Sequence, residues 1–257
     1  MIKGVLIDWG GVLTTRLSEA IGAWLAADRI DVPHYRAVMT EMVNGAYAES
    51  AAEHDTGPAA GNDADHDSGH DSGHDSGHDS GHDSGHDTET AATRENLIHA
   101  LERGEVEVAE FERALAERLR TLDGGIPVAE GILTRMFAAF RPVEPMYDML
   151  RAVRAAGMRT CLVSNSWGAE YPRDGWDELF DGIVISGEVG MRKPEPRIFR
   201  HALGVIGLEA DQCVFIDDIE ANITAARRLG IHGIHHTDPA VTLTELERLL
   251  RLTFPPV

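Results

Sequence analysis

Short apolar runs that end in small or polar residues recur along the chain and predict buried strands. These runs are Gly4 to Ile7, Arg159 to Val163, Asp181 to Ser186 and Val214 to Ile216. Stretches with a helical spacing of apolar residues, each followed by glycine, separate the later runs: Met146 to Ala156, Ile198 to Ile206 and Ile219 to Leu229. Strands that alternate with such helices predict an α/β fold, a Rossmann-like doubly wound parallel sheet.

A long region of helical pattern separates the first predicted strand from the second. The helices expected in it are Ala20 to Ala27, Tyr35 to Ala48, Arg94 to Arg103 and Ala109 to Leu122. We therefore expect a helical cap domain, residues 17–140, inserted into an α/β catalytic core made of residues 1–16 and 141–257. Such a cap would close over the carboxyl end of the first strand, where doubly wound sheets bind their ligands.

Inside the predicted cap, residues 65–87 repeat His-Asp-Ser-Gly, with histidines at positions 66, 70, 74, 78, 82 and 86. The repeat has no large apolar side chain, so burial cannot offset the entropy lost on ordering, and we expect a disordered loop over about residues 53–90. Its histidines and aspartates have the ligand chemistry for Ni²⁺, Zn²⁺ or Cu²⁺, so a transition metal is a candidate partner of this loop. A functionless repeat expansion is favoured over it, because a flexible repeat presents no fixed geometry.

Much of the acidic charge lies in this loop. The formal net charge is -20, and residues 53–90 hold eleven acidic residues and no Lys or Arg, which leaves -9 for the remainder. That balance offers no broad basic face to nucleic acid or to an anionic membrane. Cys161 and Cys213 lie in apolar runs and favour reduced thiols, and no leader or membrane-spanning run is evident. We expect a cytoplasmic protein, with monomer and homodimer both open.

Polar residues stand where two of the predicted strands end. Asp8 follows the first strand and precedes a glycine-rich turn, which can present a carboxylate oxygen to a substrate that the backbone approaches closely. Ser164 and Asn165 end the second strand with hydroxyl and amide groups able to bind phosphate oxygens beside a helix N-terminus. Taken singly, each is also explained by a turn or a helix cap.

A pair of acids and one lysine complete the set of candidate residues. Asp217 and Asp218 directly follow the last predicted strand, and two such carboxylates repel each other unless a cation lies between them. A hard divalent cation with oxygen ligands, Mg²⁺, meets that requirement. Lys193 lies between Gly190 and Pro196, in a proline-stiffened loop that can aim one ammonium group inward, although a solvated lysine is the plainer interpretation.

Together, these segments resemble the haloacid dehalogenase superfamily, whose motifs occur in this order. The similarity covers Gly4 to Thr14 and about Val143 to Thr237. Within the superfamily, Gly190 to Phe199 and Phe215 to Gly230 are most similar to the phosphatase domain of soluble epoxide hydrolase and to related bacterial sugar-1-phosphate phosphatases. The resemblance implies a magnesium-dependent phosphatase that hydrolyses a small-molecule phosphate ester, such as a sugar phosphate.

The resemblance also assigns roles to the phosphate-binding residues. It implies that Asp8 attacks phosphorus and forms an aspartyl-phosphate that water then hydrolyses. Ser164 and Lys193 would hold the phosphoryl oxygens, with Asn165 close by. In this arrangement, donors and cations neutralise charge on the phosphoryl group while the nucleophile is held in line.

The metal-binding residues follow from the same resemblance. Mg²⁺ would be bound by Asp8, by the main-chain carbonyl of Gly10 and by Asp218. Asp217 and Asn222 would support these ligands or bind the ion through water.

Gly10 marks a departure from the usual phosphatase pattern, in which a second Asp stands two residues after the nucleophile. That Asp is the general acid and base, and its loss removes a contribution of typically ~10² to 10⁴ in rate. The related bacterial phosphatases also carry Gly there. We therefore expect a substrate with a good leaving group, such as an anomeric sugar phosphate or an acyl phosphate.

Two other functions stay open at this stage. One is a non-catalytic or weakly active protein of the same fold with a metal-binding His-Asp loop. The other is 2-haloacid dehalogenation, in which the same Asp attacks carbon and no metal is needed. The paired acids at 217 and 218 favour the metal enzyme over the dehalogenase.

Overall fold

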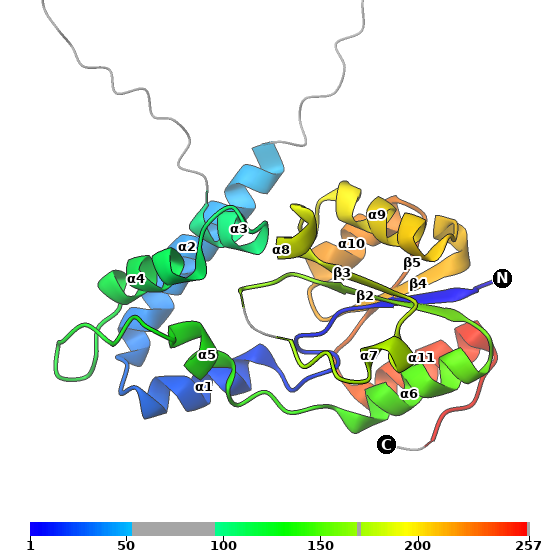
Figure 1. Cartoon of the computed structure of the whole chain (residues 1–257), viewed down its shortest axis with the longest axis horizontal. Helices are drawn as coiled ribbons and strands as arrows, with labels where there is room; N and C mark the ends of the chain where they lie inside the picture. The colour runs from blue at the N-terminus through cyan, green and yellow to red at the C-terminus, as the bar shows by residue number, and fades with distance from the viewer. Residues whose placement is uncertain (53–95, 169–170, 256–257) are drawn as a thin grey trace, which may run out of the picture.

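The computed structural model describes residues 1–52, 96–168 and 171–255, without the side chains of residues 43–52. Its centre is a five-stranded parallel sheet with the strand order β3-β2-β1-β4-β5 (Figure 1). The strands are β1 (Gly4–Ile7), β2 (Arg159–Ser164), β3 (Gly182–Ile185), β4 (Cys213–Asp217) and β5 (His232–His235). The chain runs outward from β1 to β3 on one side and through β4 to β5 on the other, so the topological switch lies between β1 and β4.

Helices cover both faces of this sheet (Figure 1). One layer contains α9 (Pro196–Ile206) and α10 (Glu220–Arg228), and the other contains α6 (Glu144–Ala155), the short α7 (Trp176–Leu179) and α11 (Pro239–Leu250). Side chains alternate across β1: Leu6 packs under α9 and α10, whereas Val5 and Ile7 pack under α6 and α11. Burial on both faces explains why the strands are short continuous apolar runs.

A second group of helices lies beyond the carboxyl end of β1 (Figure 1). It contains α1 (Leu17–Ala27), α2 (Val32–Ala52), α3 (Leu97–Glu102), α4 (Val108–Arg118) and α5 (Ile132–Phe137). These helices have a hydrophobic cluster of their own, which includes Trp24, Phe111 and Leu115. The segments that enter and leave the group pair with each other at Thr14 and Pro142. The arrangement accords with an inserted cap, and its domain boundaries at 16 and 141 stay a prediction.

The α/β class and the parallel sheet are confirmed, and the structure adds elements that the sequence did not predict. These are β5, α5, α7, α11, the one-turn helix α8 (Ser186–Val189) and a 3₁₀ turn at Ala210–Gln212. β5 has the sequence His-Gly-Ile-His, in which Ile234 is the one buried side chain, so it lacks an apolar run. Its pairing with β4 comes from its position in the sheet rather than from its composition. The predicted disordered loop at 53–90, with its repeat, lies outside the described residues.

Candidate active site

The strand register brings the predicted polar residues to one edge of the sheet. Ile7 at the end of β1 is level with Leu162 of β2 and with Ile216 of β4. Asp8 therefore follows β1 at the level where β4 ends in Asp217, and its main-chain N–H donates to the carbonyl of Ile216 at 2.9 Å. The strand order reverses direction between β1 and β4, and doubly wound folds bind their ligands at such a switch point.

Three carboxylates converge there. Asp8, Asp217 and Asp218 each offer an oxygen, and these oxygens lie within 4.8 Å of one another. Asp8 and Asp217 are buried. Gly11 has a φ of +79°, and a Cβ at this position would lie 2.3 Å from Oδ2 of Asp218. Glycine is therefore required in this turn for two reasons, the left-handed backbone and the close approach of a carboxylate.

Lys193 lies between two of these carboxylates. Its Nζ is 2.7 Å from Oδ1 of Asp8 and 2.7 Å from Oδ2 of Asp217, and its side chain is 1% exposed. The main chain of Lys193 is held by Asn165, whose Nδ2 donates to the Lys193 carbonyl at 3.0 Å and whose Oδ1 accepts from the Lys193 N–H at 2.8 Å. The loop after β2 therefore positions the lysine that the loop after β3 supplies.

The remaining bonds distinguish Asp217 from the other two acids. Its Oδ1 accepts from the main-chain N–H of Ile219 at 2.8 Å, and Nδ2 of Asn222 lies 3.0 and 3.1 Å from its two oxygens. With Lys193 as a third partner, Asp217 is fully engaged within the protein. Asp8 and Asp218 have fewer protein partners, so their oxygens remain the available ligands.

The electrostatics of the group favour an added cation. Burial lowers the pKa of Lys193, but Asp217 and Asp8 outweigh this effect, so its pKa is raised and the ammonium is held charged. Burial raises the pKa of Asp8 to about 7, against the opposing effect of Lys193 and with further raising by Asp217 and Asp218. Burial and then Asp217 raise the pKa of Asp218 to about 6. Ionising Asp8 and Asp218 beside Asp217 is therefore unfavourable even with Lys193 nearby, and an added cation would favour the ionised carboxylates.

A hard divalent cation fits this donor set. Carboxylate oxygens and main-chain carbonyls are the ligands that Mg²⁺ prefers, and a cation at Asp8 and Asp218 would remove the repulsion between them. Gly10 lines the same cavity, next to Asp8 in the chain. The residues that the sequence predicts as magnesium ligands are thus close together, and their role stays a prediction.

Ser164 also reaches this edge, with its Oγ 3.1 Å from the hydroxyl of Tyr171. Both residues line the cavity above Asp8, as does Asn165, although the amide of Asn165 is turned to the Lys193 main chain. The direction in which a Gly10 Cβ would point is open, with no atom within 4 Å. Apart from its two chain neighbours, no described residue therefore blocks a side chain at Gly10.

The cavity has a volume of about 210 Å³ and two kinds of wall. Its charged floor comes from the strand ends. Its other walls are largely apolar or aromatic: Trp9, Leu17, Ile98, Phe137, Phe140, Trp167, Tyr171 and Ile219. Several of these rings contact one another, with Phe137 stacked on Phe140 at 5.3 Å and Trp9 edge-on to Phe140 at 5.4 Å.

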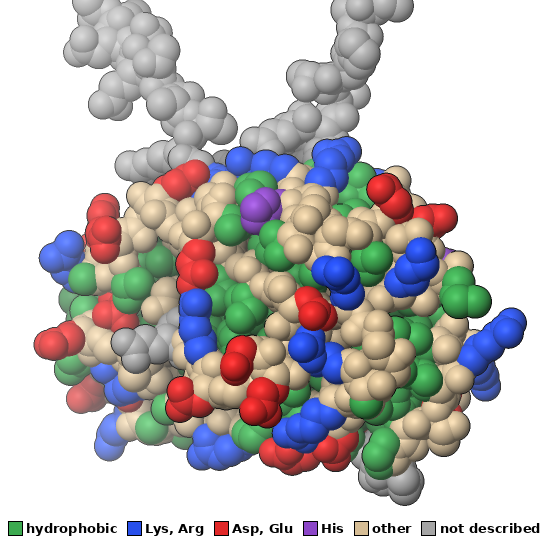
Figure 2. All heavy atoms as spheres, turned by 45° about the vertical axis from the view of Figure 1, so that its right-hand side comes forward, with side chains coloured by type: hydrophobic (Ala, Val, Ile, Leu, Met, Phe, Trp, Pro, Cys, Tyr) green, Lys and Arg blue, Asp and Glu red, His purple; other side chains and the backbone are tan. Residues whose placement is uncertain are grey.

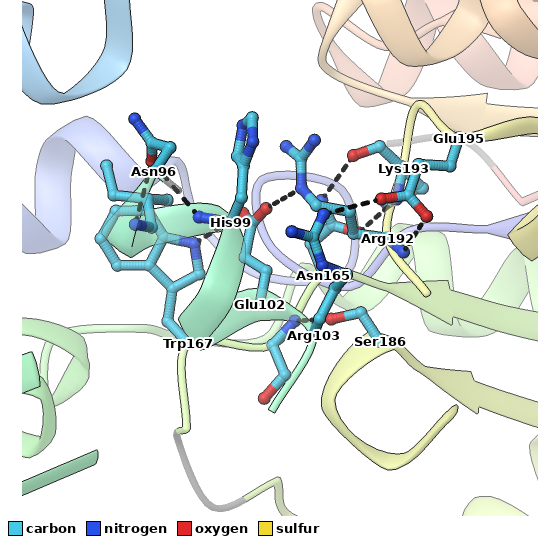
Figure 3. A network of polar contacts seen from close by, with 12 residues as sticks. Asn96, His99, Glu102, Arg103, Asn165, Trp167, Ser186, Arg192, Lys193 and Glu195 are labelled. Carbon is cyan, nitrogen blue, oxygen red and sulfur yellow. Dashed lines mark hydrogen bonds and ion pairs between the residues drawn. The ribbon is translucent and has the colours of Figure 1, made fainter. Parts of the chain in front are cut away.

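Sequence reasoning assigned no role to four polar residues of the cavity: His99, Glu102, Tyr171 and Arg192. Tyr171 contacts Ser164, and Glu102 of α3 forms a buried ion pair with Arg192, the residue before Lys193. Glu102 also accepts from Nε1 of Trp167 at 2.9 Å (Figure 3). The proximity of Arg192 to Lys193 in the chain was a usable signal for that residue. No signal in the sequence indicated the pairing of Arg192 with Glu102, because 89 residues lie between them along the chain.

Comparison with known proteins now identifies the family. The family model for haloacid dehalogenase-like hydrolases matches residues 2–230. The chain belongs to this family. Its relatives include a sesquiterpene phosphatase of Aspergillus oryzae, 31% identical over 58% of this chain and 76% of the relative. They also include rat bifunctional epoxide hydrolase 2, 33% identical over 48% of this chain and 24% of that protein, so the match spans about a quarter of the longer enzyme.

A solved structure has the same fold over almost its whole length. It is a family enzyme of Bacteroides thetaiotaomicron in complex with magnesium and inorganic phosphate, with a TM-score of 0.53, 20% identity, and coverage of 92% of this chain and 95% of that one. The predicted membership of the superfamily is confirmed, as is the hydrolase class with phosphatase relatives.

Figure 2 shows acidic and basic side chains interspersed over the face in view. None of the helices in the described ranges is both long and apolar enough to cross a membrane.

Proposed function

We propose that the protein is a magnesium-dependent phosphatase that hydrolyses a small-molecule phosphate ester through an aspartyl-phosphate on Asp8. The observation that carries this proposal is the convergence of Asp8, Lys193 and Asp218 on one cavity. Family membership and the phosphatase relatives support the same reaction class. Charge neutralisation and positioning are what phosphoryl transfer requires of a protein.

In this proposal each group of residues has a distinct task. Lys193 and Ser164 bind the phosphoryl oxygens, and Asn165 holds the main chain of Lys193 so that its ammonium stays in place. Asp8 attacks phosphorus, and water later cleaves the aspartyl-phosphate. Lys193 keeps Asp8 oriented through its 2.7 Å contact in the free enzyme.

Asp8, the carbonyl of Gly10 and Asp218 would hold the magnesium ion, with Asp217 and Asn222 supporting them. When bound, the ion supplies neutralisation of negative charge on the carboxylates and on the phosphoryl oxygens. Asp217 is suited to a supporting task because Lys193, Asn222 and the N–H of Ile219 already occupy its oxygens.

The substrate carries an apolar or aromatic group beyond the phosphate. Aromatic and aliphatic side chains line most of the cavity above the charged floor, and such walls bind hydrocarbon better than they bind the hydroxyls of a sugar. The sesquiterpene named for the A. oryzae relative is a substrate type of this kind. We therefore favour a hydrocarbon phosphate over the sugar phosphates that the sequence resemblance first indicated.

Asp8→Asn tests the nucleophile. Phosphate release from a panel of aryl, alkyl and sugar phosphates would be measured with and without Mg²⁺, with circular dichroism to establish that the variant is folded. We expect the wild type to require Mg²⁺ and the variant to lose at least about 10³-fold in kcat, as when other enzymes lose a covalent nucleophile. A folded wild type with no activity on any ester would refute the proposal.

A further inference from the structure

Arg192 is a buried cation in the active-site cavity that the mechanism above does not use. It lines the same cavity as Asp8 and Lys193 and is 8% exposed. Lys193 and the proposed divalent cation would together meet the charge of the Asp8 group. A second buried cation beside apolar walls is costly to maintain unless it has a partner or a ligand.

The orientation of Arg192 is set by Glu102. Nε of Arg192 donates to Oε2 of Glu102, and the other carboxylate oxygen accepts from Nε1 of Trp167 (Figure 3). The two side chains of the pair are 10% and 8% exposed. Because both Glu102 oxygens have donors, this carboxylate fixes the guanidinium in place from one side.

Because Arg192 contacts Glu102 through Nε, its two terminal nitrogens stay available to a ligand. Within residues 1–52, 96–168 and 171–255, Glu102 is the hydrogen-bond partner of the Arg192 side chain, and no other acceptor meets its terminal nitrogens. Figure 3 shows this end of the guanidinium extending past Glu102. A planar pair of N–H donors in a cavity matches the oxygens of a phosphate.

Gly10 indicates which phosphate this would be. The position two residues after Asp8 is Gly10 and carries no acid to protonate a departing oxygen, and the space beside Gly10 is open. A leaving group that is itself a phosphate needs no such proton, because its second pKa is about 6. A second phosphate on the substrate would therefore serve both as a ligand for Arg192 and as the leaving group.

We propose that Arg192, oriented by Glu102, binds the inner phosphate of a diphosphate ester whose hydrocarbon group lies against the aromatic walls. This inference rests on the proposed phosphatase function and names its substrate class. Arg192 then contacts the leaving group directly, and it stabilises the charge that develops on the bridging oxygen.

The reaction balances without a further reactant. The Asp8 carboxylate attacks the terminal phosphorus, the bond from that phosphorus to the bridging oxygen breaks, and its electron pair leaves with the alkyl monophosphate. Water then adds to the phosphorus of the aspartyl-phosphate, and the bond to the Asp8 oxygen breaks. Both protons of the water depart on inorganic phosphate as H₂PO₄⁻.

The test compares octyl diphosphate with octyl monophosphate, which differ by one phosphate on the same chain. We expect kcat/KM of the wild type for the diphosphate to be at least about tenfold higher. Arg192→Met should lower kcat/KM for the diphosphate by about 30- to 100-fold and for the monophosphate by less than about threefold, the usual range for loss of a charged hydrogen bond. Arg200→Met, at an exposed position of α9, is the matched control and should change neither.

Arg192→Met leaves Glu102 buried without its cation and can impair folding. The double variant Glu102→Gln/Arg192→Met removes both charges and should show the same selective loss. Equal losses on both substrates, or a wild type without a preference for the diphosphate, would overturn the inference. Absence of magnesium-dependent activity on both octyl esters and on p-nitrophenyl phosphate would instead overturn the proposed function itself.

Discussion

The floor and the roof of the cavity are built by opposite principles. The floor consists of the carboxylates at the strand ends and of Lys193, and hydrogen bonds hold its groups in place, as those from Ile219 and Asn222 hold Asp217. The roof is the part of the cavity wall that the helical group contributes, and its apolar side chains are Leu17, Ile98 and Phe137. In the proposed function the two regions have separate tasks. The floor determines the reaction, and the roof determines which substrate is bound.

Arg192 and Glu102 are the exception to this division. Arg192 belongs to the loop that carries Lys193, whereas Glu102 belongs to α3 of the helical group. A polar pair thus joins the two regions beside the apolar side chains of the roof. Substitutions in the floor should therefore have the largest effects, followed by those at Gly10 on its boundary and by those in the roof.

Lys193→Met should destabilise the floor most strongly. In magnesium-free buffer, the substitution leaves Asp8 and Asp217 facing each other without their shared cation, at a cost of about 3–5 kcal/mol in the free energy of unfolding. Urea unfolding followed by circular dichroism measures the change. Lys3→Met, at an exposed position, is the control and should stay within about 0.5 kcal/mol. A loss below about 1 kcal/mol for Lys193→Met would show that the lysine does not hold the carboxylates together.

Gly10→Asp should restore an acid at the boundary between floor and roof. A side chain fits there, because no atom lies within 4 Å of a Cβ on Gly10. We expect turnover of a simple alkyl phosphate to rise about 100-fold relative to p-nitrophenyl phosphate, since only the poorer leaving group needs a proton. Gly10→Asn adds the same shape without the acid. Equal changes in the two variants would show that the effect is steric.

Phe137→Ala should alter the roof and leave the floor intact. Phe137 stacks on Phe140 at 5.3 Å and lies edge-on to Trp167 at 6.4 Å, so its removal opens the apolar wall. KM for an octyl ester should rise about tenfold with kcat nearly unchanged, because the lost contacts bind substrate and transition state alike. Acetyl phosphate, which does not reach the roof, should be unaffected, and Leu122→Ala at an exposed position is the control. A similar rise in KM for acetyl phosphate would place Phe137 in the phosphate site instead.

The sequence predicted the floor far better than the roof, and the reason is local geometry. Asp8, Ser164 and Asp217 directly follow or end apolar strands, and parallel strands that begin together end together, so register alone brings these residues to one edge. Lys193 was harder to place, because its loop reaches the site through the hydrogen bonds with Asn165.

The roof depends on contacts between segments that are distant in the chain. Glu102 pairs with Arg192 through helix packing, and no spacing in the sequence encodes that contact. Phe137 and Phe140 look like ordinary core residues when only their pattern is considered. β5 escaped prediction for a related reason: two histidines and a glycine occupy three of its four positions, and the neighbouring strand supplies the pairing partner.

Because lysine is scarce in this chain, the side chain of Lys193 can be observed selectively by nuclear magnetic resonance. The chain has two lysines, Lys3 at an exposed position and Lys193 in the floor, against twenty-one arginines. Isotope-labelled lysine would therefore give two side-chain resonances, of which one belongs to solvent and the other to the centre of the cavity. The second resonance would report directly on the ammonium group as carboxylates, metal or phosphate change around it.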